Sequence, residues 1–180
     1  IGFTINCPEA ATTVMRDMRE VGPTVVFCPP RIWENILTTI RVKMEDAAWI
    51  KQKMYAFFIN VAQQVSSNQL RRQRVSLRLR LLYAFGEFFV YGPLRDNLGM
   101  RKIRYAYTAG AALGPEVFQF YRSIGINLKQ VYGLTETSAM CTYQPDDEVK
   151  LETVGIPLPA IEIKIGEGGE VLIKSPGVFQ

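Results

Sequence analysis

The sequence predicts an α/β fold, with a partial parallel or mixed sheet, flanking helices, a long helical section over about residues 30–92 and a C-terminal β-hairpin. Three observations support this prediction. Apolar residues recur at helical spacing through the first half of the chain. A strand–helix–strand pattern over residues 102–132 indicates a β-α-β unit, whose two strands pair in parallel. Near the carboxyl terminus, apolar and charged residues alternate around a glycine turn, which is typical of a hairpin.

The first half of the chain contains amphipathic helices. We expect a helix over residues 9–21, ended by Gly22-Pro23, and then a short buried strand over residues 24–28. Two further helices each have an apolar stripe that we interpret as core. The first stripe consists of Trp33, Ile36, Leu37, Ile40 and Met44. The second consists of Ile50, Met54, Phe57, Phe58, Val61 and Val65. Residues 66–68 are expected to end this helix, and another helix is expected over residues 69–90.

The second half changes to strands. Residues 102–107 and 127–132 are the predicted strands of the β-α-β unit. The helix between them begins at Pro115, a position that needs no N–H donor, and ends before Gly125. Residues 161–173 form the predicted hairpin. We divide the chain into an α/β part over residues 1–152 and a strand and hairpin part over residues 153–180, which begins the following subdomain.

Composition excludes several kinds of site. The chain has no histidine, which removes the usual general base of Ser-His-Asp and Cys-His sites and most zinc chemistry. The net charge of +4 is too small to choose between anionic partners, and nucleic acid is excluded because no aromatic and basic interleaving accompanies it. Cys7, Cys28 and Cys141 form no C-x-x-C pair, so we interpret each as a small core residue in a reduced, cytoplasmic compartment. Nothing in the sequence determines the oligomeric state.

Two loops follow the two strands of the β-α-β unit, over residues 108–114 and 133–138. Because parallel strands end at the same edge of a sheet, we expect these loops to face each other across a crevice, where α/β proteins place ligands. Small side chains in the first loop let a base or a sugar approach the backbone; they are Gly110, Ala111 and Ala112. Tyr132 offers an aromatic face, Thr135 a hydroxyl for a phosphate oxygen, and Glu136 a carboxylate suited to Mg²⁺.

Each loop also has a simpler interpretation. The glycines of the first loop are spaced G-x-x-x-G, which is not a dinucleotide fingerprint, and the loop lacks the lysine of a phosphate-binding P-loop. It reads equally as a turn that caps a helix. Thr135-Glu136 reads equally as a capping or surface pair. The residues by themselves therefore leave a nucleotide site and a pair of structural turns open.

Four ordered motifs resemble the adenylate-forming superfamily, which includes acyl-CoA synthetases, luciferases and the adenylation domains of peptide synthetases. The V-Y-G-L-T-E-T sequence at residues 131–137 is similar to the family's Y-G-x-T-E motif. The other motifs are P-x-x-W at residues 30–33, G-A-A-L at residues 110–113, and V-G-x-P-x-P at residues 154–159 followed by G-E at residues 169–170. The resemblance spans essentially the whole chain.

The resemblance implies roles for individual residues. Those it assigns to ATP are Gly110, Ala111, Ala112, Tyr132, Gly133 and Thr135. Thr135 and Glu136 are the catalytic pair, in which Thr135 touches the α-phosphate and Glu136 is the Mg²⁺ ligand. Trp33 and Tyr132 border the acyl substrate. The implied enzyme is an AMP-forming acid–thiol ligase, in which a carboxylate and ATP give acyl-AMP and pyrophosphate, and coenzyme A then displaces AMP.

The long helical section over residues 41–100 resembles long-chain fatty acyl-CoA synthetases, which implies a fatty acid substrate. Phe57 and Phe58 border an acyl tunnel or belong to the core, and we favour the core. A fatty acyl-AMP ligase and a peptide-synthetase adenylation domain are alternatives within the superfamily. An alternative of another class is a basic membrane-surface binding module, because an arginine cluster over residues 71–80 precedes an apolar run over residues 81–90. A solvated basic face explains the same cluster.

The resemblance also implies parts that this chain does not contain. We find no Ser/Thr/Gly-rich loop ending in lysine, which we expect before Ile1. The ribose-binding aspartate and the catalytic lysine are expected after Gln180. We therefore expect an internal fragment of the large amino-terminal domain, inactive by itself.

Overall fold

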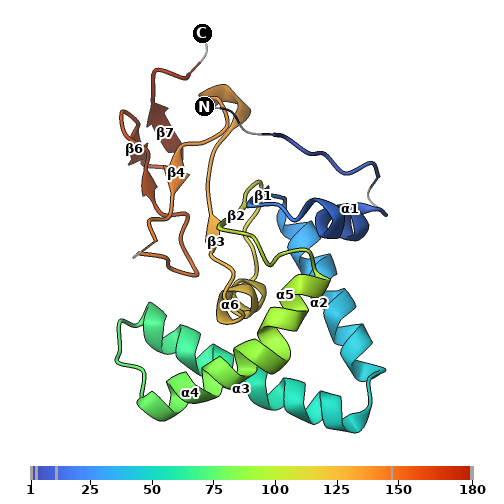
Figure 1. Cartoon of the computed structure of the whole chain (residues 1–180). Coiled ribbons are helices and arrows are strands. Elements are labelled where there is room, and N and C mark those ends of the chain that lie inside the picture. The colour runs from blue at the N-terminus through green and yellow to red at the C-terminus, as the bar shows by residue number, and fades with distance from the viewer. Residues whose placement is uncertain (1, 3, 11, 147, 179–180) are drawn as a thin grey trace.

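A three-stranded parallel sheet lies at the centre of the molecule (Figure 1). The strands are β1 (Val25–Phe27), β2 (Tyr105–Thr108) and β3 (Leu128–Gln130), in the order β1-β2-β3. Ala106 of β2 pairs with Val26 on one side and with Leu128 on the other. The computed structural model describes residues 2, 4–10, 12–146 and 148–178. The predicted α/β class and the parallel β-α-β unit are confirmed.

A long helical section connects β1 to β2. Its elements are α2 (Pro30–Glu45), α3 (Trp49–Leu70), α4 (Leu77–Gly86), the π-helix η1 (Glu87–Tyr91) and α5 (Gly92–Asn97). Figure 1 shows this section leaving the sheet along α2, turning along α3 and returning along α4 and α5. The connection from β2 to β3 is short and contains only α6 (Pro115–Ser123), which begins at the predicted proline.

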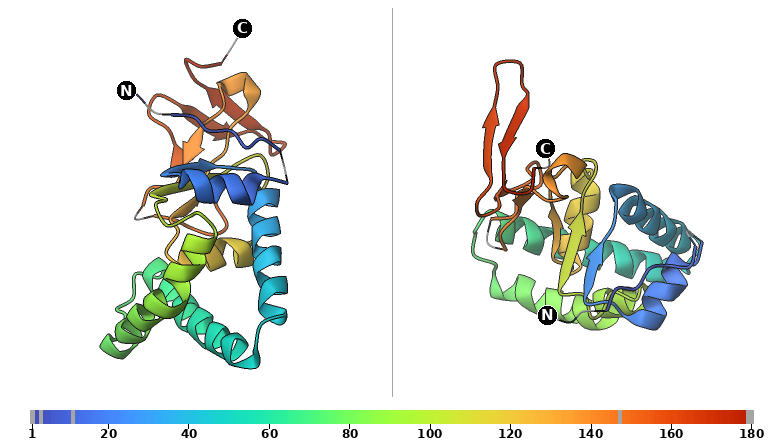
Figure 2. Two further views of the ribbon diagram at one scale, coloured as in Figure 1. Left: turned by 45° about the vertical axis from the view of Figure 1, so that its right-hand side comes forward. Right: turned by 90° about the horizontal axis from the view of Figure 1, so that it is seen from above.

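The carboxyl-terminal part forms two antiparallel strand pairs. The pair β6 (Glu162–Ile165) and β7 (Val171–Lys174) is the predicted hairpin, which is confirmed. Figure 2 shows it projecting away from the sheet and the helices. A shorter pair, β4 (Thr142–Tyr143) with β5 (Ile156–Pro157), joins it to the sheet region. The division of the chain after residue 152 stays a prediction.

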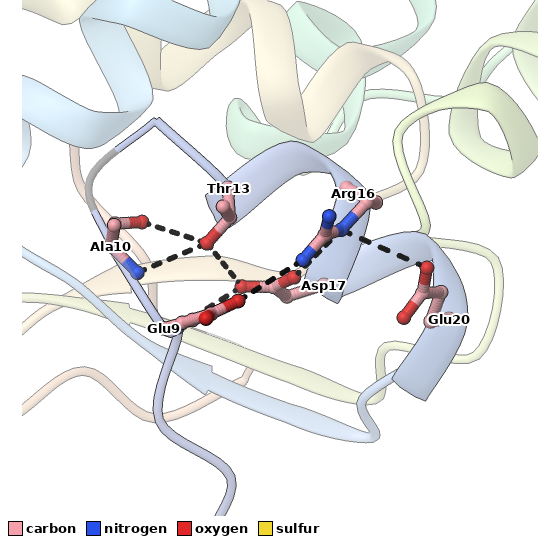
Figure 3. Close-up of polar contacts among 6 residues, drawn as sticks. All are labelled: Glu9, Ala10, Thr13, Arg16, Asp17 and Glu20. Atoms are coloured by element: carbon pink, nitrogen blue, oxygen red, sulfur yellow. Dashed lines mark hydrogen bonds and ion pairs between the residues drawn. The ribbon is translucent and has the colours of Figure 1, made fainter.

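The first helix, α1 (Val14–Val21), is shorter than the predicted helix over residues 9–21, of which residue 11 lies outside the described residues. Side chains fix its start (Figure 3). The Thr13 hydroxyl accepts from the Ala10 N–H at 3.0 Å and donates to an Asp17 carboxylate oxygen at 2.6 Å. The Thr13 hydrogen bond holds the pKa of Asp17 below its usual value. These local bonds satisfy the turn before residue 14, so the helix does not extend further back.

The stripe of α2 packs against α6 as predicted. Trp33 has no exposed surface, and its ring meets the Tyr121 ring edge-on at a centroid distance of 4.9 Å. The Tyr121 hydroxyl donates to the Trp33 carbonyl at 2.7 Å, which joins the two helices by a buried hydrogen bond. Three further residues of the stripe are buried, and Met44 packs against them; the three are Ile36, Leu37 and Ile40.

The stripe of α3 is only partly buried. Phe58, Val61 and Val65 face the core, whereas the other three residues, Ile50, Met54 and Phe57, are exposed. The prediction that the whole stripe is core is therefore wrong. Phe58 packs against the core, as predicted, whereas Phe57 is 54% exposed and does not. In the first turns of α3, the stripe that packs against the core consists of Tyr55, Phe58 and Ile59, and Met54 and Phe57 lie to one side of it.

The predicted helix boundaries around residue 70 are wrong. The α3 helix continues through residues 66–68, because Ser66 is buried and Ser67 accepts a hydrogen bond from Gln119 of α6 at 2.9 Å. These serines make tertiary contacts inside the helix, so they do not end it. The α4 helix then begins only at Leu77, after Ser76 caps it by accepting the Leu79 N–H at 3.3 Å.

Two predictions of burial also fail. Val25 and Phe27 are 54% and 58% exposed, because they lie on a face of the sheet that is largely open; Tyr105, the neighbour of Val25 on the same face of the central strand, is 44% exposed. Cys7 is exposed in the segment before α1, which contradicts its interpretation as a core residue. Cys141 is buried, as predicted, and Cys28 is partly buried.

We expect the three thiols to differ sharply in reactivity. Burial raises the pKa of the Cys28 thiol to about 12, so it stays protonated at pH 8, and Cys141 is inaccessible. Alkylation at pH 8 should modify Cys7 at least about 100-fold faster than Cys28, because the thiolate is the nucleophile. Peptide mass mapping measures the rates, and labelling in denaturant, where all three should react alike, is the control. Rapid native labelling of Cys28 would contradict its burial.

Candidate active site

The loops that follow β1, β2 and β3 meet at one edge of the sheet around an open hollow of about 560 Å³. It is lined by Phe27, Pro29, Ala109, Gly110, Gly133, Leu134, Thr135, Ser138 and Ala139. The predicted meeting of the two loops, over residues 108–114 and 133–138, is confirmed. The carboxyl edge of a parallel sheet is where open α/β folds place ligands.

Three of the predicted site residues line this hollow: Gly110, Gly133 and Thr135. Ala111 and Ala112 are exposed further along the first loop, Tyr132 is half-buried, and Glu136 is exposed next to Thr135. Trp33 lies fully buried between α2 and α6, so it meets Tyr121 and not the hollow. The roles assigned to all of these residues stay predictions.

A 3-10 turn, η2 (Thr135–Thr137), presents the two polar side chains of the second loop. The buried Thr137 hydroxyl holds the turn, since it accepts the Leu134 N–H at 3.2 Å and the Cys141 thiol at 2.8 Å. Thr135 and Glu136 are exposed, and neither side chain has a hydrogen bond or ion pair with any residue the structure describes. The turn therefore leaves one hydroxyl and one carboxylate available to a ligand.

The chain after this turn folds back tightly on Gly133. Ser138 and Ala139 have positive φ values of 57° and 85°, which L-residues rarely adopt and which carry backbone strain. A Cβ atom at Gly133 would lie 1.6 Å from the Ala139 carbonyl oxygen. The Ala139 N–H donates to the Leu134 carbonyl at 3.1 Å, and the Cys141 N–H donates to the Tyr132 carbonyl at 2.7 Å. Glycine at position 133 is required by this close approach and not by its own backbone angles.

Two buried glutamines, which the sequence analysis did not single out, connect the loops. Gln144 accepts the Gln130 N–H at 2.9 Å and donates to the Lys150 and Thr153 carbonyls at 2.6 and 2.7 Å. Gln130 accepts the Leu113 N–H of the first loop at 3.4 Å and donates to the Leu151 carbonyl at 3.0 Å. The sequence signal is Gln130 inside the predicted strand over residues 127–132, where apolar residues are usual.

The buried Thr108 hydroxyl, at the end of β2, has no hydrogen-bond partner among the described residues. It lies next to Ala109, which lines the hollow. Its backbone carbonyl accepts the Val131 N–H at 3.0 Å, so only the side chain is unsatisfied. An unpaired buried hydroxyl beside a ligand-sized hollow is consistent with a partner supplied from outside the described chain.

The chemistry of the lining suits part of a nucleotide. A Cβ atom added at Gly110 would have no other atom within 4 Å, so a flat group can approach the backbone there. No lysine or arginine lines the hollow within the described ranges. Nor do three His, Cys, Asp or Glu side chains of the described chain gather as a metal site. Glu136 alone suits Mg²⁺, which typically takes one or two protein carboxylates and completes its shell with substrate phosphates and water.

Comparison with known proteins identifies the family. A model of the AMP-binding enzyme family matches residues 1–180. The chain belongs to the AMP-binding enzyme family. The match covers every residue named above, including both loops that border the hollow. Among the described residues of this AMP-binding chain, no helix has the length and apolar character that a membrane span requires.

Curated relatives of this AMP-binding chain include fatty-acid–CoA ligases. The chain is 28% identical over 180 residues to the putative fatty-acid–CoA ligase fadD11 of Mycobacterium tuberculosis, covering 99% of this chain and 32% of that protein. It is 33% identical over 157 residues to the long-chain-fatty-acid–CoA ligase FadD15 of Mycobacterium bovis, covering 87% of this chain and 26% of that protein. The chain thus spans about a third or less of these relatives.

A solved structure supports the fold of the AMP-binding chain. The complex of VinN with L-aspartate matches 93% of this chain and 32% of that chain, with a TM-score of 0.54 and 19% identity. At this identity the likeness concerns the fold alone. It covers the helical section as well as the strands, so the arrangement in Figure 1 is one that a solved structure shares.

We expect substitution of Gly133 to damage the loop far more than substitution of Gly110. Gly133→Ala places a carbon against the Ala139 carbonyl and should destabilise the protein by about 3 kcal/mol, the upper end for overpacking. Gly110→Ala meets no atom and should cost about 1–2 kcal/mol through its positive φ of 92°. Thermal unfolding of both variants measures the difference. Equal shifts would show that the fold-back onto Gly133 is not tight.

Proposed function

We propose that this chain is part of an AMP-forming long-chain fatty acyl-CoA synthetase. The enzyme activates a fatty acid with Mg-ATP to acyl-AMP and pyrophosphate, and then transfers the acyl group to coenzyme A. The observation that carries the proposal is the hollow at the carboxyl edge of the sheet, where Gly110, Gly133 and Thr135 come together in a chain of the AMP-binding family.

Each residue at this edge has a task suited to its chemistry. The backbone around Gly110, with Ala111 and Ala112, leaves room for the adenine. Thr135 donates its unpaired hydroxyl to the α-phosphate, and Glu136 supplies a carboxylate oxygen to Mg²⁺ between the phosphates. These groups act by positioning and by neutralising charge, which dominate this class of phosphoryl chemistry.

The names of the relatives favour coenzyme A as the second substrate. Both are described as fatty-acid–CoA ligases, whereas a fatty acyl-AMP ligase stops at the adenylate. The product formed with and without coenzyme A separates these alternatives. The 180 residues by themselves should not form acyl-AMP, because no cation lines the described hollow to offset the charge of a triphosphate.

Replacing either residue of the polar pair should slow adenylation strongly without unfolding the protein. In the full-length protein, Glu136→Gln should slow ATP–pyrophosphate exchange by on the order of 100-fold or more, because it removes a charge aimed at the reacting phosphates. Thr135→Val should slow it about tenfold to a hundredfold through the lost hydrogen bond to a charged group. Both residues are exposed, so thermal stability should not change.

The matched control is Glu167→Gln, which removes an exposed carboxylate from the turn of the hairpin and should leave exchange unchanged. If Glu136→Gln retains the exchange rate of the wild type, the metal assignment fails.

Fatty acids of about a dozen carbons or more should be far better substrates than acetate. Each buried methylene contributes about 0.8 kcal/mol, or about fourfold in kcat/KM, as long as the acyl chain stays enclosed. Measuring kcat/KM for a series of saturated acids, with an amino acid and an aryl acid for comparison, tests this. A preference for acetate, an amino acid or an aryl acid would overturn the substrate class but not the adenylation chemistry.

A further inference from the structure

The α4 helix carries an apolar face that no described element covers. The face consists of Leu77, Leu81, Phe85 and Phe88, spaced i, i+4, i+8 and i+11, which places them on one side of the helix and of the π-turn that continues it. Leu77 and Phe88, at its two ends, are 77% and 75% exposed. Leu82 and Phe89 widen the face. A continuous apolar patch of this kind marks an interaction surface.

Arginines precede this face and alternate with its first residues, and no acidic residue lies among them. Residues 69–86 contain five arginines and neither aspartate nor glutamate; the arginines are Arg71, Arg72, Arg74, Arg78 and Arg80. Three of them, Arg72, Arg74 and Arg80, border a hollow of about 490 Å³ between the end of α3 and the start of α4, which we call the arginine hollow. Gln69, Gln73 and Tyr83 add polar groups to its wall.

Two arginines of the arginine hollow, Arg74 and Arg80, have no ion pair with any residue that the structure describes, whereas Arg72 is paired. Arg72 reaches Glu148 at 3.5 Å across the surface, where both side chains are solvated. Glu87, the first acidic residue after the cluster, pairs with Arg95 and is not part of the wall of the hollow. A basic hollow beside an exposed apolar helix face is complementary to one kind of surface, in which acyl chains lie beneath a layer of negative charge.

The position of α4 in the fold permits such contact. Figure 1 shows α3 and α4 at the end of the molecule opposite the β6–β7 hairpin, and Figure 2 shows α4 projecting beyond the body. The hollow at the carboxyl edge of the sheet contains no residue of α3 or α4. Binding at α4 therefore leaves the proposed nucleotide site open.

We propose that α4 and the loop before it bind the surface of anionic phospholipid membranes. The helix lies in the plane of the interface, with its apolar face among the acyl chains and the side chains of the arginine hollow beside the lipid phosphates. Burial of leucine and phenylalanine drives binding, and the arginines make it depend on anionic lipid and on salt. This surface does not depend on the proposed function, because none of its residues belongs to the nucleotide site.

Co-sedimentation of the full-length protein with vesicles tests the proposal. We expect binding to phosphatidylcholine vesicles that contain phosphatidylglycerol, weaker binding as salt rises, and little binding to phosphatidylcholine alone. Arg74→Gln with Arg80→Gln should weaken binding about 30-fold, since each basic residue near an anionic surface contributes about a factor of five. Leu81→Gln with Phe88→Gln should weaken it by on the order of 100-fold.

The matched control is Lys164→Gln with Lys174→Gln, which removes two positive charges from the hairpin at the opposite end of the molecule. It should retain vesicle binding within about twofold, because these charges lie away from the interface. Circular dichroism should show wild-type folding for all three double variants, since the replaced side chains are exposed.

Three outcomes would overturn the proposal. Vesicle binding that survives the apolar variant would place the contact elsewhere. A change in oligomeric mass with no vesicle binding would show that a second copy covers the face. Loss of folding in the apolar variant, together with no vesicle binding by the wild type, would show that another part of the protein covers it.

Discussion

Parallel pairing of β1, β2 and β3 requires each connection to run from one end of the sheet back to the other, which no tight turn can do. One connection is the single helix α6, and the other is the whole section from α2 to α5. The same pairing brings the carboxyl ends of all three strands to one edge. The core, the helical section and the candidate active site therefore follow from one pattern of backbone hydrogen bonds.

The candidate active site combines exposed groups with a buried framework. Thr135 and Glu136 have no partner within the described part of the chain, whereas the residues behind them are fully engaged. Thr137 fixes the turn, and Gln130 and Gln144 tie the loops to the segment over residues 150–153. Groups that must contact a ligand gain precision when buried hydrogen bonds hold their backbone, since the ligand then does not have to order the loop.

The two ends of the molecule differ in character. The sheet edge has small and polar side chains around an open hollow, and no cation lines its described wall. The α4 end has arginines and exposed leucine and phenylalanine side chains. Because the two surfaces lie at different ends and share no residue, a ligand at one does not exclude a ligand at the other.

Local patterns in the sequence were enough to predict several elements. Helical spacing identified α2, Pro115 and Gly125 bounded α6, and alternation around glycines identified the β6–β7 hairpin. The Y-G-L-T-E-T motif identified the second loop of the site. Burial depends on the tertiary structure: Val25 and Phe27 are exposed because their face of the sheet is largely open, and α3 passes through Ser66 because its neighbours bury it. The requirement for glycine at position 133 also comes from the tertiary structure, because the Ala139 carbonyl oxygen occupies the space that a Cβ atom would need. Burial and close approach depend on residues distant in the chain, which a local pattern does not contain.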